Sequence, residues 1–71
     1  MEPAKISFDR VGKNIRRHRK AQAIKQEWLA MKIGLDKSEI SRIESGKRNI
    51  SVKNLFQIAA TLEIDPSQLF L

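Results

Sequence analysis

The chain of 71 residues contains no cysteine and only one histidine, His18. Without cysteine there can be no disulfide bond and no thiolate ligand for a metal ion. His18 continues the apolar stripe of a predicted helix, where a half-buried packing role is expected for a lone histidine. The sequence therefore predicts no metal site and no cofactor, and the lack of cysteine fits a reducing cytoplasm.

Long apolar runs and aromatic residues are also scarce. The longest apolar runs span only a few residues, which predicts neither a transmembrane helix nor a signal peptide. The few aromatic residues are not spaced as a stacking platform, which disfavours RNA and single-stranded DNA as partners. So small a core leaves no deep cleft, and no nucleophile is paired with a base, so we expect neither an enzyme nor a small-molecule ligand.

Acidic residues are few and unevenly placed. The net charge is +6, with fourteen Lys and Arg against eight Asp and Glu. Residues 1–53 hold all fourteen cations and six of the acids, a net charge of +8, whereas residues 54–71 carry only Glu63 and Asp65. A basic front and a mildly acidic back suit a polyanion on one side and a second subunit on the other. The alternative is a merely solvated basic surface.

Apolar residues recur three and four positions apart, and no segment alternates with period two. This pattern predicts an all-α fold of five helices without a sheet. We place the helices at residues 8–21, 26–33, 36–44 and 52–62, with a short fifth helix that opens at Asp65–Pro66. Residues 1–7 are interpreted as a flexible N-terminal arm and residues 8–71 as one domain.

The second and third predicted helices are joined very tightly. Gly34 can end the second helix in a left-handed conformation, and Asp36 can cap the third by accepting from a backbone N–H near Glu39. Small Ala30 allows a close approach, while Ile40 and Ile43 anchor the third helix to the core. Two short helices joined in this way form a helix-turn-helix.

With Ile40 and Ile43 inside, the third helix presents a polar outer face that suits base reading in the major groove. Its candidate base-contacting residues are Lys37, Ser38, Ser41 and Arg42. Glu39 could accept from a cytosine amino group or pair with Arg42 instead. Candidates for phosphate contacts are Gln26, at the first turn of the second helix, and Lys47 and Arg48, in the loop after Gly46.

The C-terminal end is more apolar than a small monomer can bury. Leu69, Phe70 and Leu71 cannot all lie in so small a core, which predicts a second subunit that covers part of them. The candidate interface residues are Ile64, Leu69 and Leu71. Trp28 lies off the apolar stripe of its helix, with Lys32 one turn later, and is interpreted either as a cover for apolar neighbours or as a contact surface.

Three segments together resemble the Cro/C1-type (XRE family) helix-turn-helix of phage repressors and small bacterial regulators. They are IRRHR, QEWLAMKIGLDKSEISRIESGKRN and SVKNLFQIAATLEID, and the resemblance extends from Val11 to Phe70, nearly the whole chain. Gln26, Ala30, Gly34, Ile40 and Ile43 match the family's motif positions. The resemblance implies a lambda-repressor-like domain that binds double-stranded DNA. The SGKRN–S turn and the expected absence of a further domain are similar to the stand-alone members, including controller proteins of restriction–modification systems.

The same resemblance implies a buried ion pair between Arg19 and Glu44. Three residues depart from the family pattern: Ala23 stands where glycine is usual, Lys25 where a serine or threonine cap is usual, and His18 where leucine is usual. Taken together, the sequence predicts a homodimeric, sequence-specific transcriptional regulator acting on a palindromic operator. An antitoxin-like protein-interaction module built on the same fold is the alternative.

Overall fold

Helices account for most of the chain in the computed structural model, which describes residues 8–71. They are α1 (Phe8–Ala21), α2 (Gln26–Ile33), α3 (Lys37–Glu44), α4 (Val52–Thr61) and the 3₁₀ helix η1 (Pro66–Phe70). Within this range there is no strand, which confirms the all-α class. None of these helices is long and apolar enough to cross a membrane. The predicted arm, residues 1–7, lies outside the described residues.

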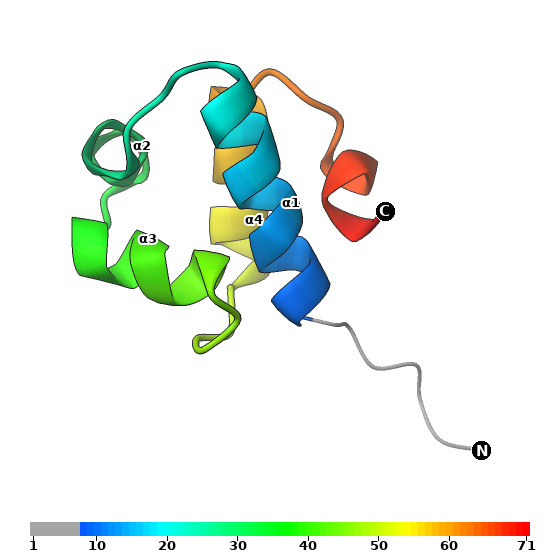
Figure 1. The fold of residues 1–71 in the computed structure, drawn as a ribbon, viewed down its shortest axis with the longest axis horizontal. Helices are drawn as coiled ribbons and strands as arrows, with labels where there is room; N and C mark the ends of the chain where they lie inside the picture. The colour runs from blue at the N-terminus through cyan, green and yellow to red at the C-terminus, as the bar shows by residue number, and fades with distance from the viewer. Residues whose placement is uncertain (1–7) are drawn as a thin grey trace.

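The five elements surround one apolar core. In Figure 1, α1 runs through the centre of the view, with α2 and α3 on one side and η1 on the other. α1 packs against α3 and η1, α2 packs against α3 and α4, and α4 packs against η1, so the contacts close into a ring. The core residues are Val11, Ile15, Leu29, Ala30, Ile33, Ile40, Ile43, Leu55, Ile58, Ala59, Leu62 and Leu69. α3 is thereby held by both α1 and α2.

The turn between α2 and α3 has the predicted construction. Gly34 ends α2 in the left-handed region, with φ 74°. The Asp36 carboxylate accepts from the backbone N–H of Glu39 at 2.8 Å, and the Glu39 carboxylate accepts from the backbone N–H of Asp36 at 3.3 Å. This reciprocal capping box satisfies two donors at the start of α3. Hydrogen bonds from the Ser38 hydroxyl and the Glu39 N–H hold the pKa of Asp36 below its ordinary value, so the cap stays ionised.

The start of α2 is less well fixed, as the departures at Ala23 and Lys25 suggest. Lys25 is the N-cap residue and makes no side-chain capping hydrogen bond. Ala23 follows the end of α1 with φ 57°. The N–H of Ala23 bonds to the carbonyl of Lys20 and the N–H of Ile24 to the carbonyl of Arg19, the two bonds of a Schellman turn. Such a turn favours glycine at the position that Ala23 occupies.

We expect Ala23→Gly to stabilise the fold by about 1 kcal/mol, because it removes the left-handed strain of an exposed alanine. In thermal unfolding this corresponds to a rise in Tm of roughly 4–8 °C for a domain of this size. The control is Ala60→Gly, the same change at an exposed position inside α4, which should lower stability by about 1 kcal/mol. A Tm that falls for both variants would contradict the strain at Ala23.

The prediction of five α-helices is wrong at the C-terminal end, where the structure has four α-helices and η1. Asp65 and Pro66 start the element as predicted, and the Asp65 carboxylate accepts from the N–H of Ser67 at 2.9 Å. The element has only five residues, and its N–H of Gln68 bonds to the carbonyl of Asp65, three residues back. A segment this short gains little from the α-helical bond pattern, so the tighter 3₁₀ form results.

Leu69 was predicted at a subunit interface, and this placement is wrong. Its side chain is fully buried within the monomer core. The buried Asn14 amide of α1 donates to the backbone carbonyls of Leu69 at 3.0 Å and Leu71 at 3.1 Å. These two bonds hold η1 against α1 and turn Leu69 inward, a long-range contact that local apolar spacing cannot reveal.

Candidate nucleic-acid interface

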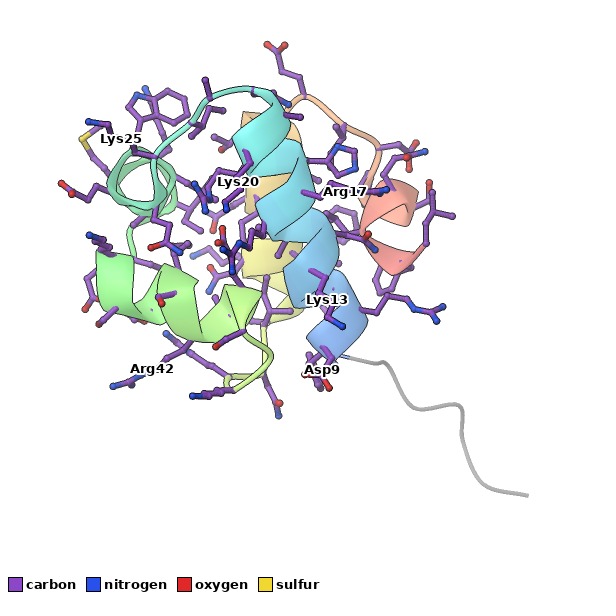
Figure 2. The ribbon with its side chains drawn as sticks, in the orientation of Figure 1. Asp9, Lys13, Arg17, Lys20, Lys25 and Arg42 are labelled. Atoms are coloured by element: carbon purple, nitrogen blue, oxygen red, sulfur yellow. The ribbon has the colours of Figure 1, made fainter. Side chains whose placement is uncertain are left out.

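The outer face of α3 carries all four candidate base-contacting side chains. Lys37, Ser38, Ser41 and Arg42 are exposed, on the side away from the buried Ile40 and Ile43. Arg42 points away from the rest of the molecule (Figure 2). The Ser38 hydroxyl donates to the Asp36 carboxylate at 2.6 Å, so its oxygen remains as an acceptor. The face thus combines two long cations with two hydroxyls.

Arg19 and Glu44 meet in the interior as a bidentate ion pair. Arg19 Nε donates to Glu44 Oε2 at 2.6 Å and its Nη2 donates to Oε1 at 2.9 Å. The side chains are only 9% and 2% exposed. Arg19 Nη1 also donates to the Ile24 carbonyl at 2.7 Å, and the Gln26 amide donates to Glu44 Oε1 at 3.0 Å. This buried cluster joins α1, the start of α2 and the end of α3.

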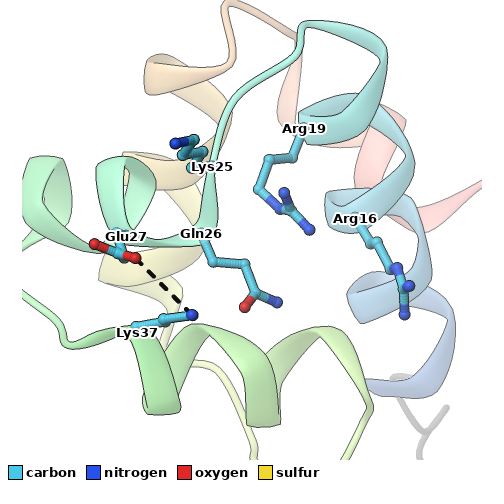
Figure 3. Close-up of a pocket in the computed structure, with 6 residues that line it drawn as sticks. All are labelled: Arg16, Arg19, Lys25, Gln26, Glu27 and Lys37. Carbon is cyan, nitrogen blue, oxygen red and sulfur yellow. Dashed lines mark ion pairs between the residues drawn. The ribbon is translucent and has the colours of Figure 1, made fainter.

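An open pocket of about 400 Å³ lies over this cluster (Figure 3). Its lining residues come from α1 and from the beginnings of α2 and α3: Arg16, Arg19, Lys25, Gln26, Glu27 and Lys37. Four of the six are cations, and the exposed Lys37–Glu27 pair is loose, at 3.9 Å. The N-terminus of α2, with its unpaired backbone N–H groups, opens at the same place. The pocket therefore suits a phosphate group in charge and in donor chemistry.

The loop after α3 holds two cations in different states. Lys47 is exposed, and no acidic side chain pairs with it among residues 8–71. Arg48 is partly buried, and its Nη1 donates to Glu39 Oε2. Glu39 therefore pairs with Arg48 and not with Arg42, the partner that its position on the helix suggested. Among the residues that the structure describes, Arg42 forms no ion pair with an acidic side chain.

Comparison with known proteins identifies the family to which this fold belongs. The helix-turn-helix family HTH_3 matches residues 15–69, which include α2, α3 and the turn between them. The chain belongs to this family. The control protein C.MunI of Mycoplasma sp. is 44% identical over 71 residues, which are 99% of this chain and 92% of that protein.

Solved structures of helix-turn-helix proteins agree with this assignment. The restriction-modification controller protein C.AhdI from Aeromonas hydrophila superposes with a TM-score of 0.84 at 38% identity, over 89% of this chain and 96% of that one. The P22 c2 repressor protein, in complex with a synthetic operator, superposes with a TM-score of 0.78 at 28% identity, over 84% and 91% of the two chains. The predicted resemblance to controller proteins of restriction–modification systems is thereby confirmed.

Within this helix-turn-helix protein, two cations of the pocket, Arg16 and Lys25, were not assigned to the site from the sequence. Arg16 lies three residues before Arg19 on α1, so it shares the side of the helix that carries the ion pair. Lys25 drew notice only as a poor cap for α2. Both reach the pocket because the buried Arg19–Glu44–Gln26 cluster brings α1, the start of α2 and the end of α3 together. The positions of Arg19 and Gln26 in the family motif were the available signal.

One exposed apolar surface of the helix-turn-helix protein lies on α4 and at the C-terminal end, around η1. Ile64 is half-buried, and Leu71 is 67% exposed. Val52 and Phe70, at 69% and 41% exposure, line one apolar hollow, and Phe56 follows Val52 by one helical turn. Phe70 takes the outward position at the C-terminal end that was predicted for Leu69. We refer to Val52, Phe56, Phe70 and Leu71 as the apolar patch.

Proposed function

We propose that the protein binds duplex DNA sequence-specifically, as a homodimer, and regulates transcription from a two-fold symmetric operator. The observation that carries the proposal is the exposed polar face of α3 beside the cationic pocket. An eight-residue helix is about 12 Å long, close to the width of the major groove of B-DNA. Inserted there, Lys37, Ser38, Ser41 and Arg42 meet base edges.

The pocket supplies the backbone contact that would set the register of α3. Gln26 donates one amide N–H to Glu44, so its second N–H can donate to a phosphate oxygen. Arg16 and Lys25 flank the same position, and Lys47 reaches the backbone from the loop at the other end of α3. The DNA would therefore be held on both sides of the recognition helix.

The apolar patch supports the homodimer. Two copies that meet through α4 and η1 would cover the hollow between Val52 and Phe70 and the exposed Leu71, a self-complementary contact of the kind that two-fold symmetry requires. The two α3 helices would then enter half-sites about 34 Å apart, or a small multiple of that distance. The likeness to C.MunI and C.AhdI supports a narrower proposal, that the operator controls genes of a restriction–modification system.

The test starts from duplexes selected by binding from a random pool. Lys37→Ala or Arg42→Ala should relax base preference by roughly 1–3 kcal/mol for each good contact. Lys47→Ala should instead weaken binding to all sequences alike and lower the dependence of log K on log salt by about 0.9 for each phosphate lost. Lys53→Ala, at an exposed position on α4, serves as the control for charge alone. Equal losses on selected and scrambled duplexes for all three variants would remove the reading roles.

A protein-interaction module is the second candidate, favoured by two exposed apolar side chains on α2. Trp28 is 41% exposed and Met31 66%, and Lys32 Nζ lies 5.0 Å from the centroid of the Trp28 ring. The lysine covers one face of the ring, as its spacing predicted. Co-purification of a fixed protein partner, in place of duplex binding, would favour this function.

A further inference from the structure

Glu39 joins two parts of the DNA-binding surface that are distant in sequence. It lies in the first turn of α3, where its Oε1 accepts from the backbone N–H of Asp36 at 3.3 Å. Its Oε2 accepts from Arg48 Nη1. The loop that carries Arg48 leaves the C-terminal end of α3 (Figure 1), so this side chain runs back along the helix to reach the first turn. The two side chains remain 28% and 37% exposed.

The position of the Arg48 guanidinium differs from that of a cation that contacts only the flanking DNA phosphates. The first turn of a recognition helix is the part that goes deepest into the major groove. A guanidinium has five N–H groups in a planar fork, and Glu39 uses one of them. The others stay available beside the turn that carries Lys37 and Ser38. Lys47, one residue earlier, forms no ion pair within residues 8–71, so its side chain can follow the phosphates.

The charge of the pair also points to base reading. Together Glu39 and Arg48 carry no net charge, so the pair adds little to the sequence-independent attraction of the phosphates. A lone carboxylate on this face would repel DNA, and Arg48 neutralises it. What the pair adds is a set of donors in a fixed direction, which is the property that discriminates one base from another.

From this arrangement we infer that Arg48 is a base-reading residue that donates to O6 and N7 of a guanine. Glu39 is the positioning residue that holds its guanidinium at the first turn of α3. The inference rests on the proposed function, because it assumes that α3 enters the major groove. It replaces the phosphate contact that the loop position of Arg48 suggested, and it adds a guanine contact to the half-site.

The experiment compares four full-length proteins on the selected duplex and on duplexes in which each base pair of the half-site is changed. They are the wild type, Arg48→Lys, Glu39→Gln and the neighbouring control Lys47→Gln. Arg48→Lys keeps the charge and loses the fork. Glu39→Gln keeps the capping box, since glutamine serves at that position, and loses the charge that holds Arg48. Circular dichroism and Tm establish that each variant is folded, and affinity is measured over a range of salt concentrations.

We expect Arg48→Lys to lose discrimination at one G·C pair by roughly 5- to 150-fold, with little change in the salt dependence. Glu39→Gln should lose discrimination at the same base pair, by a smaller factor. Lys47→Gln should keep the full base preference and lower the salt dependence. If Arg48→Lys and Glu39→Gln lose discrimination at the same base pair, Glu39 acts by positioning Arg48. A general loss of stability would not produce losses confined to one base pair.

Two results would overturn the inference. Full base preference in Arg48→Lys would show that only its charge matters, and losses at different base pairs in Arg48→Lys and Glu39→Gln would remove the positioning role. Arg42→Ala separates this inference from the proposed function. If it relaxes the preference at its own position while Arg48→Lys does not, the proposed function stands and the inference falls. If no variant changes the preference among duplexes, both fall.

Discussion

Arg19→Ala is expected to lower the free energy of unfolding by about 3–5 kcal/mol, because Glu44 would remain as an unpaired charge in the interior. The Glu44 side chain is only 2% exposed, so its carboxylate depends on the guanidinium and on the Gln26 amide in place of water. A domain of this size has roughly 4–11 kcal/mol of total stability, so the loss is a large part of it. Thermal unfolding of Arg19→Ala beside Arg17→Ala, an exposed cation on the same helix, gives the measurement.

The expected loss of stability comes from the unpaired Glu44 carboxylate, and a double variant tests this cause. The double variant Arg19→Ala/Glu44→Gln also removes the carboxylate charge. The free energy of unfolding of this double variant should exceed that of Arg19→Ala alone. DNA binding should weaken in Arg19→Ala even below its Tm, because the ion pair and the Gln26 bond fix α3 against the start of α2. A loss of ~3 kcal/mol predicts a Tm for Arg19→Ala well below that of Arg17→Ala. If the two Tm values agree within about 2 °C, the pair does not stabilise the fold.

The four α-helices were predictable because each has an apolar stripe, and α3 and α4 also begin with side-chain caps. The apolar stripe of α1 gives its bounds, Phe8–Ala21, and Gly34 with Asp36 marks the turn before α3. The outward orientation of Ser38, Ser41 and Arg42 then follows from the inward position of Ile40 and Ile43. These are consequences of helical periodicity and capping, which act within a few residues.

The parts that the sequence did not predict depend on contacts between distant segments. Leu69 turns inward because the Asn14 amide holds η1, 55 residues away. Arg48 reaches Glu39 only because the loop turns back at Gly46, which has φ 77°. The pocket that includes Arg16 and Lys25 depends on how α1 and the starts of α2 and α3 come together. None of these contacts produces a periodic pattern in the sequence.

Gly12 shows the same dependence on tertiary contact, since nothing in the helical pattern of α1 singles it out. It lies in a buried turn of α1 where the helix meets the end of α3. A Cβ at this position would overlap the backbone carbonyl oxygen of Ile43 and lie 2.8 Å from that of Glu44. The missing side chain therefore sets how closely α1 approaches the end of the recognition helix. The ion pair between Glu44 and Arg19, which lies two turns after Gly12 on α1, requires that close approach.

Two effects oppose each other in Gly12→Ala, and their sizes decide the expected sign. Alanine is favoured over glycine inside a helix by about 1 kcal/mol. Overpacking against backbone atoms, which cannot rotate away, costs roughly 3 kcal/mol or more. We therefore expect a net loss near 2 kcal/mol and a Tm lower by roughly 8–16 °C. Lys13→Ala, at the adjacent exposed position, should change stability by less than about 0.5 kcal/mol.

The functional consequence of Gly12→Ala is a displaced recognition helix. Below the Tm of the variant, α3 would be pushed away from α1 at its C-terminal end, so binding to the selected duplex should fall more than binding to scrambled DNA. Helix propensity alone predicts the opposite result, a Tm above that of the wild type with base preference unchanged. That outcome would mean that α1 and α3 separate without cost, and the close packing of these two helices would then not be what positions α3.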